Sequence, residues 1–167
     1  MTQSIGISEK TSRKNPINPN LLTANQATCT NALGTTAGFL TYDGTCTKTS
    51  STDHPFKGSK SLKTVTNGDA PPERIYTDPA VSVTAGQPYT ASAQVYAPLN
   101  RKMRLDMYSS SLGAGQHIFF TGTGTWQSVT ATFTATDTGI FIFIGTDTDT
   151  SATTFYVGEL ILRKGTY

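Results

Sequence analysis

The sequence has few charged residues, few cysteines and no long apolar run. Charged residues make up 14% of the 167 positions, and the net charge is only +2. Low charge argues against disorder driven by self-repulsion. No stretch approaches the roughly 18 consecutive apolar residues of a membrane-spanning helix, and the first residues lack the apolar region of a signal peptide. We therefore expect a chain that is made in a cytoplasm and either stays there or is released by a route other than secretion, with no membrane partner.

The net positive charge comes from the start of the chain. Residues 1–20 contain three basic residues and one acidic residue, which accounts for the whole net charge, and the remainder is balanced. A balanced body offers no electrostatic surface for nucleic acid. Pro16 and Pro19 disfavour a helix or a central strand. We therefore predict an extended arm over residues 1–20 and a single domain over residues 21–167.

Catalytic and metal-binding patterns are scarce. The two histidines, His54 and His117, lie far apart and outside any nucleophile motif, and no Cys/His grouping has zinc spacing. Asp106 and Glu159 could meet in space, but no spacing pairs them for glycoside hydrolysis. We predict a protein without catalytic residues or a metal site.

Cys29 and Cys46 are the only cysteines. They could form a disulfide across neighbouring strands, which would stabilise the fold by about 3 kcal/mol in the chain-entropy model. In a reducing cytoplasm the alternative is two small buried thiols. The sequence leaves both readings open.

Short segments of β-branched and aromatic residues follow one another along the body, separated by Gly, Pro, Asn and Asp. Alternation of apolar and polar residues predicts half-buried strands. Regularly spaced short strands of this kind are typical of an all-β sandwich or barrel. The predicted strands are 38–42, 45–49, 61–66, 73–77, 80–83, 89–97, 103–108, 116–121, 126–134, 140–144 and 155–163.

Three local patterns refine this prediction. Asp43-Gly44 is a hairpin signal between the first two strands. Strand 140–144 is apolar on both faces, which indicates a central strand covered on both sides. Trp126 begins an amphipathic strand, so we assign its side chain to the core.

Strands 89–97 and 103–108 carry the candidate ligand site. If these two strands are neighbours, their polar faces project together. Aromatic rings can stack on sugar rings, and amide, guanidinium and carboxylate groups can bind sugar hydroxyls. The alternative is an ordinary solvated or protein-packed sheet face. The candidate sugar-binding residues are Gln94, Tyr96, Arg104, Asp106 and Tyr108.

Several short motifs occur in a fixed order, and together they resemble a known family. They are Asn-Leu-Leu at 20–22, Gly-Ser-Lys-Ser-Leu at 58–62, Ala-Gly-Gln-Pro-Tyr-Thr-Ala-Ser at 85–92, Gly-Thr-Trp-Gln-Ser-Val at 124–129 and Phe-Tyr-Val-Gly-Glu-Leu at 155–160. The series resembles the jelly-roll carbohydrate-binding modules of families 4, 9 and 22, which are close to galactose-binding-like domains. The resemblance implies an antiparallel two-sheet jelly-roll β-sandwich, often with a sugar cleft on the concave sheet.

The resemblance also bears on calcium. Such domains often hold a structural calcium ion with an Asp near the start of the closing strand, where this sequence has Gly158. We therefore expect no cofactor, although Asp147 and Asp149 could bind a cation. Alternating Thr and Asp is, however, a common loop composition.

Two functional hypotheses follow. Unsecreted jelly rolls of this kind also resemble components of tailed bacteriophage particles, so the first hypothesis is a non-enzymatic virion protein, a capsid-decoration or tail-associated jelly roll. The arm would dock on a capsid or tail protein, and homo-oligomers are compatible with this role. The second hypothesis is a module that recognises host-surface glycans. The predicted docking residues of the arm are Ile5, Ile7, Lys10, Arg13, Lys14 and Ile17.

Overall fold

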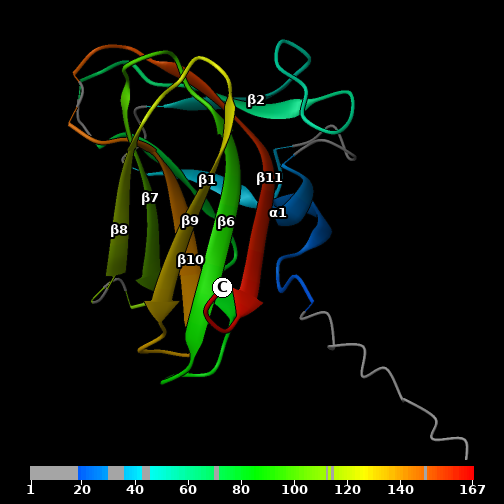
Figure 1. The fold of residues 1–167 in the computed structure, drawn as a ribbon, viewed down its shortest axis with the longest axis vertical. Helices are drawn as coiled ribbons and strands as arrows, with labels where there is room; N and C mark the ends of the chain where they lie inside the picture. Colours follow the sequence, from blue (N-terminus) through cyan, green and yellow to red (C-terminus); the bar gives the residue numbers. More distant parts are fainter. Residues whose placement is uncertain are drawn as a thin grey trace, which may run out of the picture.

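The structure is a computed structural model that describes residues 19–29, 36–42, 46–69, 72–111, 113, 115–148 and 150–167. It consists of two antiparallel sheets packed face to face (Figure 1). Sheet A contains, in order, β1 (Phe39–Tyr42), β4 (Arg74–Thr77), β10 (Gly139–Thr146), β7 (Lys102–Ser109) and β8 (Gly115–Thr121), and β5 (Val81–Ser82) pairs with β10. Sheet B contains, in order, β2 (Thr47–Ser51), β3 (Ser61–Val65), β11 (Thr154–Lys164), β6 (Pro88–Tyr96) and β9 (Trp126–Thr134). The predicted all-β two-sheet sandwich is confirmed.

The core lies between the two sheets and follows the alternation in the sequence. On β6 the odd-numbered side chains from Tyr89 to Val95 are buried, and on β7 Met103, Leu105 and Met107 are fully buried. Each strand therefore has an inner, core-facing side and an outer side. The outer faces of sheets A and B point in opposite directions, so residues on them cannot share one site.

The last two strands are the central strands of the two sheets. β10 lies between β4 and β7, and β11 lies between β3 and β6, with a bulge between Val157 and Glu159. β10 is buried on both faces, because Ile142 points into the core while Phe143, on the outer face, is only 2% exposed. The prediction that residues 140–144 form a covered central strand is confirmed.

The predicted pairing of strands 89–97 and 103–108 is wrong. β6 pairs with β11 and β9 in sheet B, and β7 pairs with β10 and β8 in sheet A. The segment between them therefore crosses from one sheet to the other. The alternation of apolar and polar residues could not show whether the two strands are neighbours in one sheet or lie in opposite sheets. In both arrangements the apolar faces of the strands point into the same core.

The hairpin predicted between the first two strands is also wrong, because β1 pairs with β4 and β2 pairs with β3. Residues 43–45, which carry its turn signal, lie outside the described residues. The residues predicted as the docking surface of the arm, from Ile5 to Ile17, lie outside them as well.

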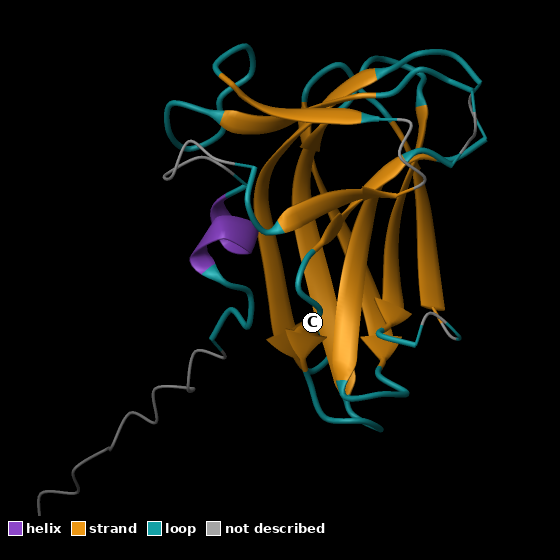
Figure 2. Cartoon of the chain, turned by 180° about the vertical axis from the view of Figure 1, so that it is seen from behind, coloured by secondary structure: helices purple, strands orange, loops and turns teal. Residues whose placement is uncertain are grey.

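One short helix, α1 (Ala24–Thr28), packs beside β11 on the flank of the sandwich (Figure 2). A capping box fixes its start: the Thr23 hydroxyl accepts from the Gln26 backbone, and the Gln26 side chain accepts from the Thr23 backbone. The sequence prediction missed this helix, although Thr-x-x-Gln was its signal. No helix in the described part of the chain is long and apolar enough to cross a membrane.

Cys29 and Cys46 are both buried and reduced, so the disulfide reading is wrong. The two sulfur atoms lie against different carbonyl oxygens, since Cys29 Sγ donates to Gln26 and Cys46 Sγ donates to Arg74, both at 3.4 Å. Burial, and to a lesser extent the negative charge of Glu159, raises the pKa of the Cys29 thiol far above its usual range. This thiol is therefore unreactive in the folded protein.

Candidate functional site

The outer face of sheet A carries a row of aromatic and charged side chains. On β7 the side chains of Arg104, Asp106 and Tyr108 point away from the core. Sheet register places Asp106 between Phe143 of β10 and His117 of β8. These residues come from strands that are far apart in the sequence, so the fold assembles the row.

Asp106 is the centre of a buried ionic network. Its carboxylate is fully buried. Asp106 Oδ2 accepts hydrogen bonds from Arg74 Nη1 at 2.7 Å and from Arg104 Nε at 2.8 Å. His117 Nδ1 lies 3.0 Å from Asp106 Oδ1 and 2.8 Å from Arg104 Nη2. Arg104 Nη1 also lies 3.6 Å from Asp147 Oδ1. Two arginines thus face two aspartates, and the network is balanced in charge.

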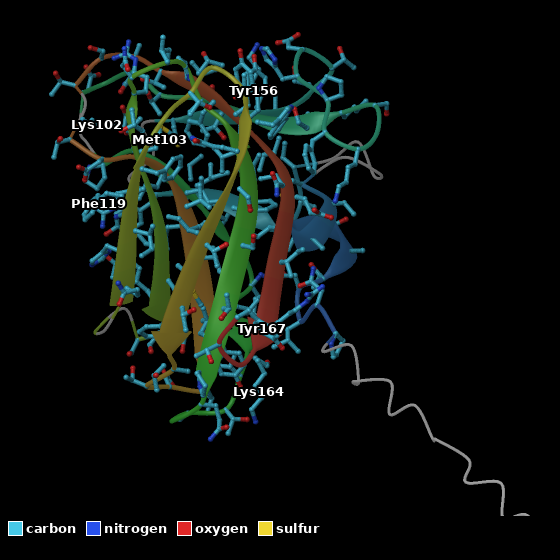
Figure 3. All side chains as sticks on the ribbon, viewed as in Figure 1. Lys102, Met103, Phe119, Tyr156, Lys164 and Tyr167 are labelled. Atoms are coloured by element: carbon cyan, nitrogen blue, oxygen red, sulfur yellow. The ribbon has the colours of Figure 1, made fainter. Side chains whose placement is uncertain are left out.

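Aromatic rings cover this network. The Arg74 guanidinium lies between the rings of Tyr42 and Phe143, at 4.6 and 4.9 Å from their centroids. The Arg104 guanidinium lies 5.5 Å from the Phe119 ring, which is 61% exposed on the edge strand β8 (Figure 3). Cation–π contacts of this kind hold a guanidinium and a ring in a fixed relative position. The aromatic surface is therefore supported from beneath.

A hollow of about 170 Å³ opens in this surface, lined by Tyr42, Arg74, Tyr108 and Phe143. The phenol hydroxyls of Tyr42 and Tyr108 make no hydrogen bond within the described residues, so both are available to a ligand. A half-exposed ring with an available hydroxyl can offer an apolar contact and a polar one together.

Two glycines give these side chains their room. A Cβ on Gly145 would lie 2.1 Å from the Glu73 carbonyl oxygen and 2.7 Å from Arg74 Cγ. A Cβ on Gly115 would lie 2.6 Å from the Tyr108 ring. The stem of Arg74 and the ring of Tyr108 can therefore lie across neighbouring strands because those positions carry no side chain.

The structure divides the residues predicted as one sugar-binding face into two groups. Arg104, Asp106 and Tyr108 lie together in the site on sheet A. Gln94 and Tyr96 lie on the outer face of sheet B, so the prediction of a single site is wrong for them. The missed residues are Tyr42, Arg74, Phe143, His117 and Phe119. The sequence alone assigned no face to these residues, and only the sheet register shows that they meet.

Tyr96 and Trp126 form a separate aromatic cluster at one end of sheet B. They are partners in register, and the loop between β2 and β3 packs on them. His54 stacks on Tyr96 at 3.9 Å between centroids, and Phe56 lies 5.0 Å from Trp126. Trp126 is half-buried on the outer face, so its assignment to the core is wrong; it shares the outward side of β9 with Ser128.

The two carboxylates considered for glycoside hydrolysis lie in different sheets of the described structure. Asp106 lies in sheet A and Glu159 in sheet B, where Glu159 accepts from Lys57 at 3.0 Å, so the two carboxylates do not share a site. No group of three metal-ligating side chains occurs in the ranges that the structure describes. The ordered features of the site are therefore a rigid, ring-covered surface with a small hollow.

A family model described as a carbohydrate binding domain of families 4 and 9 matches residues 23–150. The chain belongs to this carbohydrate-binding domain family. The resemblance of the sequence motifs to jelly-roll carbohydrate-binding modules is thereby confirmed. No curated protein shows a significant match to this carbohydrate-binding domain.

Solved structures share the fold of this domain. The CBM22-1 xylan-binding domain of Xyn10C from Paenibacillus barcinonensis has a TM-score of 0.66 and 15% identity, over 88% of this chain and 95% of that one. TmCBM61 in complex with β-1,4-galactotriose has a TM-score of 0.62 and 14% identity, over 88% and 99% of the two chains. The enzymatically active domain of tailspike protein 4 from bacteriophage CBA120 has a TM-score of 0.63 and 8% identity, over 87% of this chain and 21% of that one.

Proposed function

We propose that this carbohydrate-binding domain binds a neutral glycan on the outer face of sheet A. The observation that carries the proposal is the hollow between Tyr42 and Tyr108, whose rings are half-exposed and whose hydroxyls have no partner in the described structure. Sugars present an apolar face of C–H groups and a rim of hydroxyls. The two tyrosines offer a complementary apolar surface and hydrogen-bonding groups to each.

The buried network beneath the rings supports this role by holding the surface rigid. Arg74 bridges from β4 to Asp106 on β7, so the ring-bearing strands are fixed relative to one another before any ligand binds. A preformed surface does not have to be ordered on binding, which favours affinity. Arg74 is 5% exposed and Asp106 fully buried, so the network acts as a base and the rings make the contact.

The charge balance of the network favours an uncharged ligand. Arg74 and Arg104 both face the carboxylate of Asp106, and Arg104 also faces Asp147. An acidic sugar at the hollow would have to compete with these carboxylates for the same guanidinium groups. We therefore propose a neutral oligosaccharide. Of the two hypotheses drawn from the sequence, the family match supports the second, a glycan-binding module, better than the first.

Titration calorimetry with neutral oligosaccharides, including β-1,4-linked xylose, galactose and glucose oligomers, tests the proposal. We expect Tyr108→Ala to weaken binding about five- to thirtyfold, since losing a stacked ring and its hydroxyl removes about 1–2 kcal/mol. Tyr96→Ala is the matched control, because it removes the same side chain from the opposite sheet, and binding should stay within about twofold of wild type. Binding that depends on Tyr96 and not on Tyr108, or no binding to any neutral glycan, would overturn the proposal.

The first hypothesis, a role in a bacteriophage particle, stays a prediction. The tailspike likeness at 8% identity concerns the fold, and residues 1–18 lie outside the described structure. Its test is deletion of residues 1–20, which should leave the domain folded and abolish its incorporation into a particle. Unchanged incorporation of the shortened chain would contradict it.

A further inference from the structure

A second groove lies on the outer face of sheet B, on the opposite side of the sandwich from the proposed neutral-glycan site. Its volume is about 310 Å³. Its floor is built in register from three strands, with Arg163 opposite Thr90, Ile161 opposite Ser92, and Ser92 opposite Thr130. Tyr167, which is 72% exposed, forms one wall in front of β6 and β11 (Figure 3). The floor thus carries four polar side chains beside Ile161, and the wall is aromatic.

Arg163 is an uncompensated cation on this face. Two other basic side chains, Lys63 on sheet B and Lys57 in the loop between β2 and β3, are paired with carboxylates. Lys57 lies 3.0 Å from Glu159, and Lys63 lies 2.7 Å from Asp53. Arg163 has no carboxylate within 4 Å in the part of the chain that the structure describes, and its Nε is buried without an acceptor. None of the side chains that line the groove is acidic. The groove therefore offers positive charge to whatever enters it.

Two hydroxyls on the floor are weakly engaged. The Thr130 hydroxyl donates to Ser92 Oγ at 3.4 Å, and Ser92 Oγ lies 3.4 Å from Ser128 Oγ. Both distances are long for a hydroxyl–hydroxyl hydrogen bond. Thr90, by contrast, donates to the Gly165 carbonyl at 2.7 Å and helps fix the C-terminal turn. Ser92 and Thr130 can therefore turn toward a ligand at little cost.

The wall is held in place as well. The Tyr167 hydroxyl donates to the Lys164 carbonyl at 3.1 Å, which folds the ring back toward the strand it follows. A ring fixed in this way can cover the face of a six-membered ligand ring lying on the floor. Guanidinium, hydroxyls and ring then surround the same space from three sides.

We propose that this groove is a second carbohydrate site, selective for an acidic sugar. The anionic group of the sugar, a carboxylate or a sulfate, pairs with Arg163, while Ser92 and Thr130 bind ring hydroxyls and Tyr167 covers the ring. A guanidinium fork matches either anion in a bidentate geometry. The site is independent of the one on sheet A, and the domain thereby binds two chemically different glycans on opposite faces.

Calorimetry on the full chain with oligogalacturonate, sulfated dextran and neutral dextran tests this inference at two salt concentrations. We expect at least one acidic ligand to bind, neutral dextran not to bind at this groove, and Arg163→Gln to weaken acid binding by about tenfold or more. Thr130→Trp, at an exposed strand position, should block the groove without disturbing the core. Lys164→Gln, which removes the neighbouring charge, is the control and should change binding by less than about twofold.

The outcomes separate the sources and the two sites. If oligogalacturonate binds and the binding depends on Arg163, the anionic group that the groove recognises is a carboxylate. If only sulfated dextran binds in this way, the group is a sulfate. Equal losses of affinity for the acidic ligand in Arg163→Gln and Lys164→Gln would indicate general charge attraction and overturn the proposal. Binding of the acidic ligand that survives Thr130→Trp would also overturn it. So would the absence of binding by either acidic ligand. Tyr108→Ala should leave acid binding intact, so failure of the sheet A site and failure of this groove are distinguishable.

Discussion

Replacing Asp106 with Asn would test whether the buried network holds the sheet A surface together. The substitution keeps the shape of the side chain and removes its charge, so the guanidinium groups of Arg74 and Arg104 lose their shared partner. Their side chains are only 7% and 12% exposed, and water cannot readily take the place of the carboxylate. Removing one partner of a buried ion pair costs about 3–5 kcal/mol. That loss would be a large fraction of the typical stability of a domain, which is about 5–15 kcal/mol.

Thermal and urea unfolding measure this loss directly. For a chain of this size, a loss of about 3–5 kcal/mol corresponds to a decrease in Tm of about 6–20 °C. The same variant should bind neutral glycans more weakly even below its Tm, since the Arg74 and Arg104 side chains would no longer be fixed beneath the rings. Urea is preferable to guanidinium chloride here, because it leaves the ionic strength unchanged.

A second variant identifies the cause of the loss. Replacing Arg74 and Arg104 with Met and Asp106 with Leu removes the fully or nearly buried charges together. Stability should recover relative to Asp106→Asn, because the only carboxylate of the network that then lacks an arginine, Asp147, is 22% exposed and can be solvated. A Tm change below about 3 °C for Asp106→Asn, or an apolar triple variant less stable than the single one, would refute the reasoning.

Three further predictions concern other parts of the fold. Gly145→Ala should lower the Tm by about 5 °C or more, because its Cβ would overlap a carbonyl oxygen of the neighbouring strand. Asp53→Asn should be less stable than wild type at pH 7: hydrogen bonds, above all from Lys63, hold the pKa of Asp53 below its usual range, so the stabilisation exists above the unfolded pKa of about 4. The difference should disappear as the pH falls through the folded pKa, as melting curves from neutral to strongly acidic pH would show. Cys29 and Cys46 should resist a thiol reagent in the native protein and should react when the protein is unfolded in urea without reductant. An intact mass two hydrogen atoms below that of the reduced chain would instead indicate a disulfide and contradict the prediction.

The sequence was sufficient to predict most of the strands and, for the strands with one apolar face, which residues point into the core. Period-two alternation identifies core positions wherever one side of a strand is apolar, as in β7, where Leu105 points inward and Asp106 outward. It also identified β10 as central, because a strand that is apolar on both sides must be covered on both sides. Local patterns of this kind depend on each strand alone. They failed at Trp126, which we assigned to the core but which lies on the outer face of β9.

Pairing between strands could not be read in the same way. Tyr96 and Tyr108 have equivalent positions on two consecutive strands, yet they lie on opposite outer faces because the connection crosses between the sheets. The partners of Asp106 come from β4 and β8 as well as from its own strand, and no local pattern links Arg74 to a carboxylate 32 residues away. The site is therefore a property of the sheet register, which distant parts of the chain determine together.

The central position of β10 and β11 has a consequence for how the protein is made. Until residues 154–164 have been synthesised, β3 and β6 have no strand between them, and sheet B exists only as two separate pairs with open edges. Open strand edges invite pairing with other chains. The sandwich can therefore close only after residues 154–164 have left the ribosome. A nascent chain truncated before β11 should aggregate, whereas one that includes β11 should not.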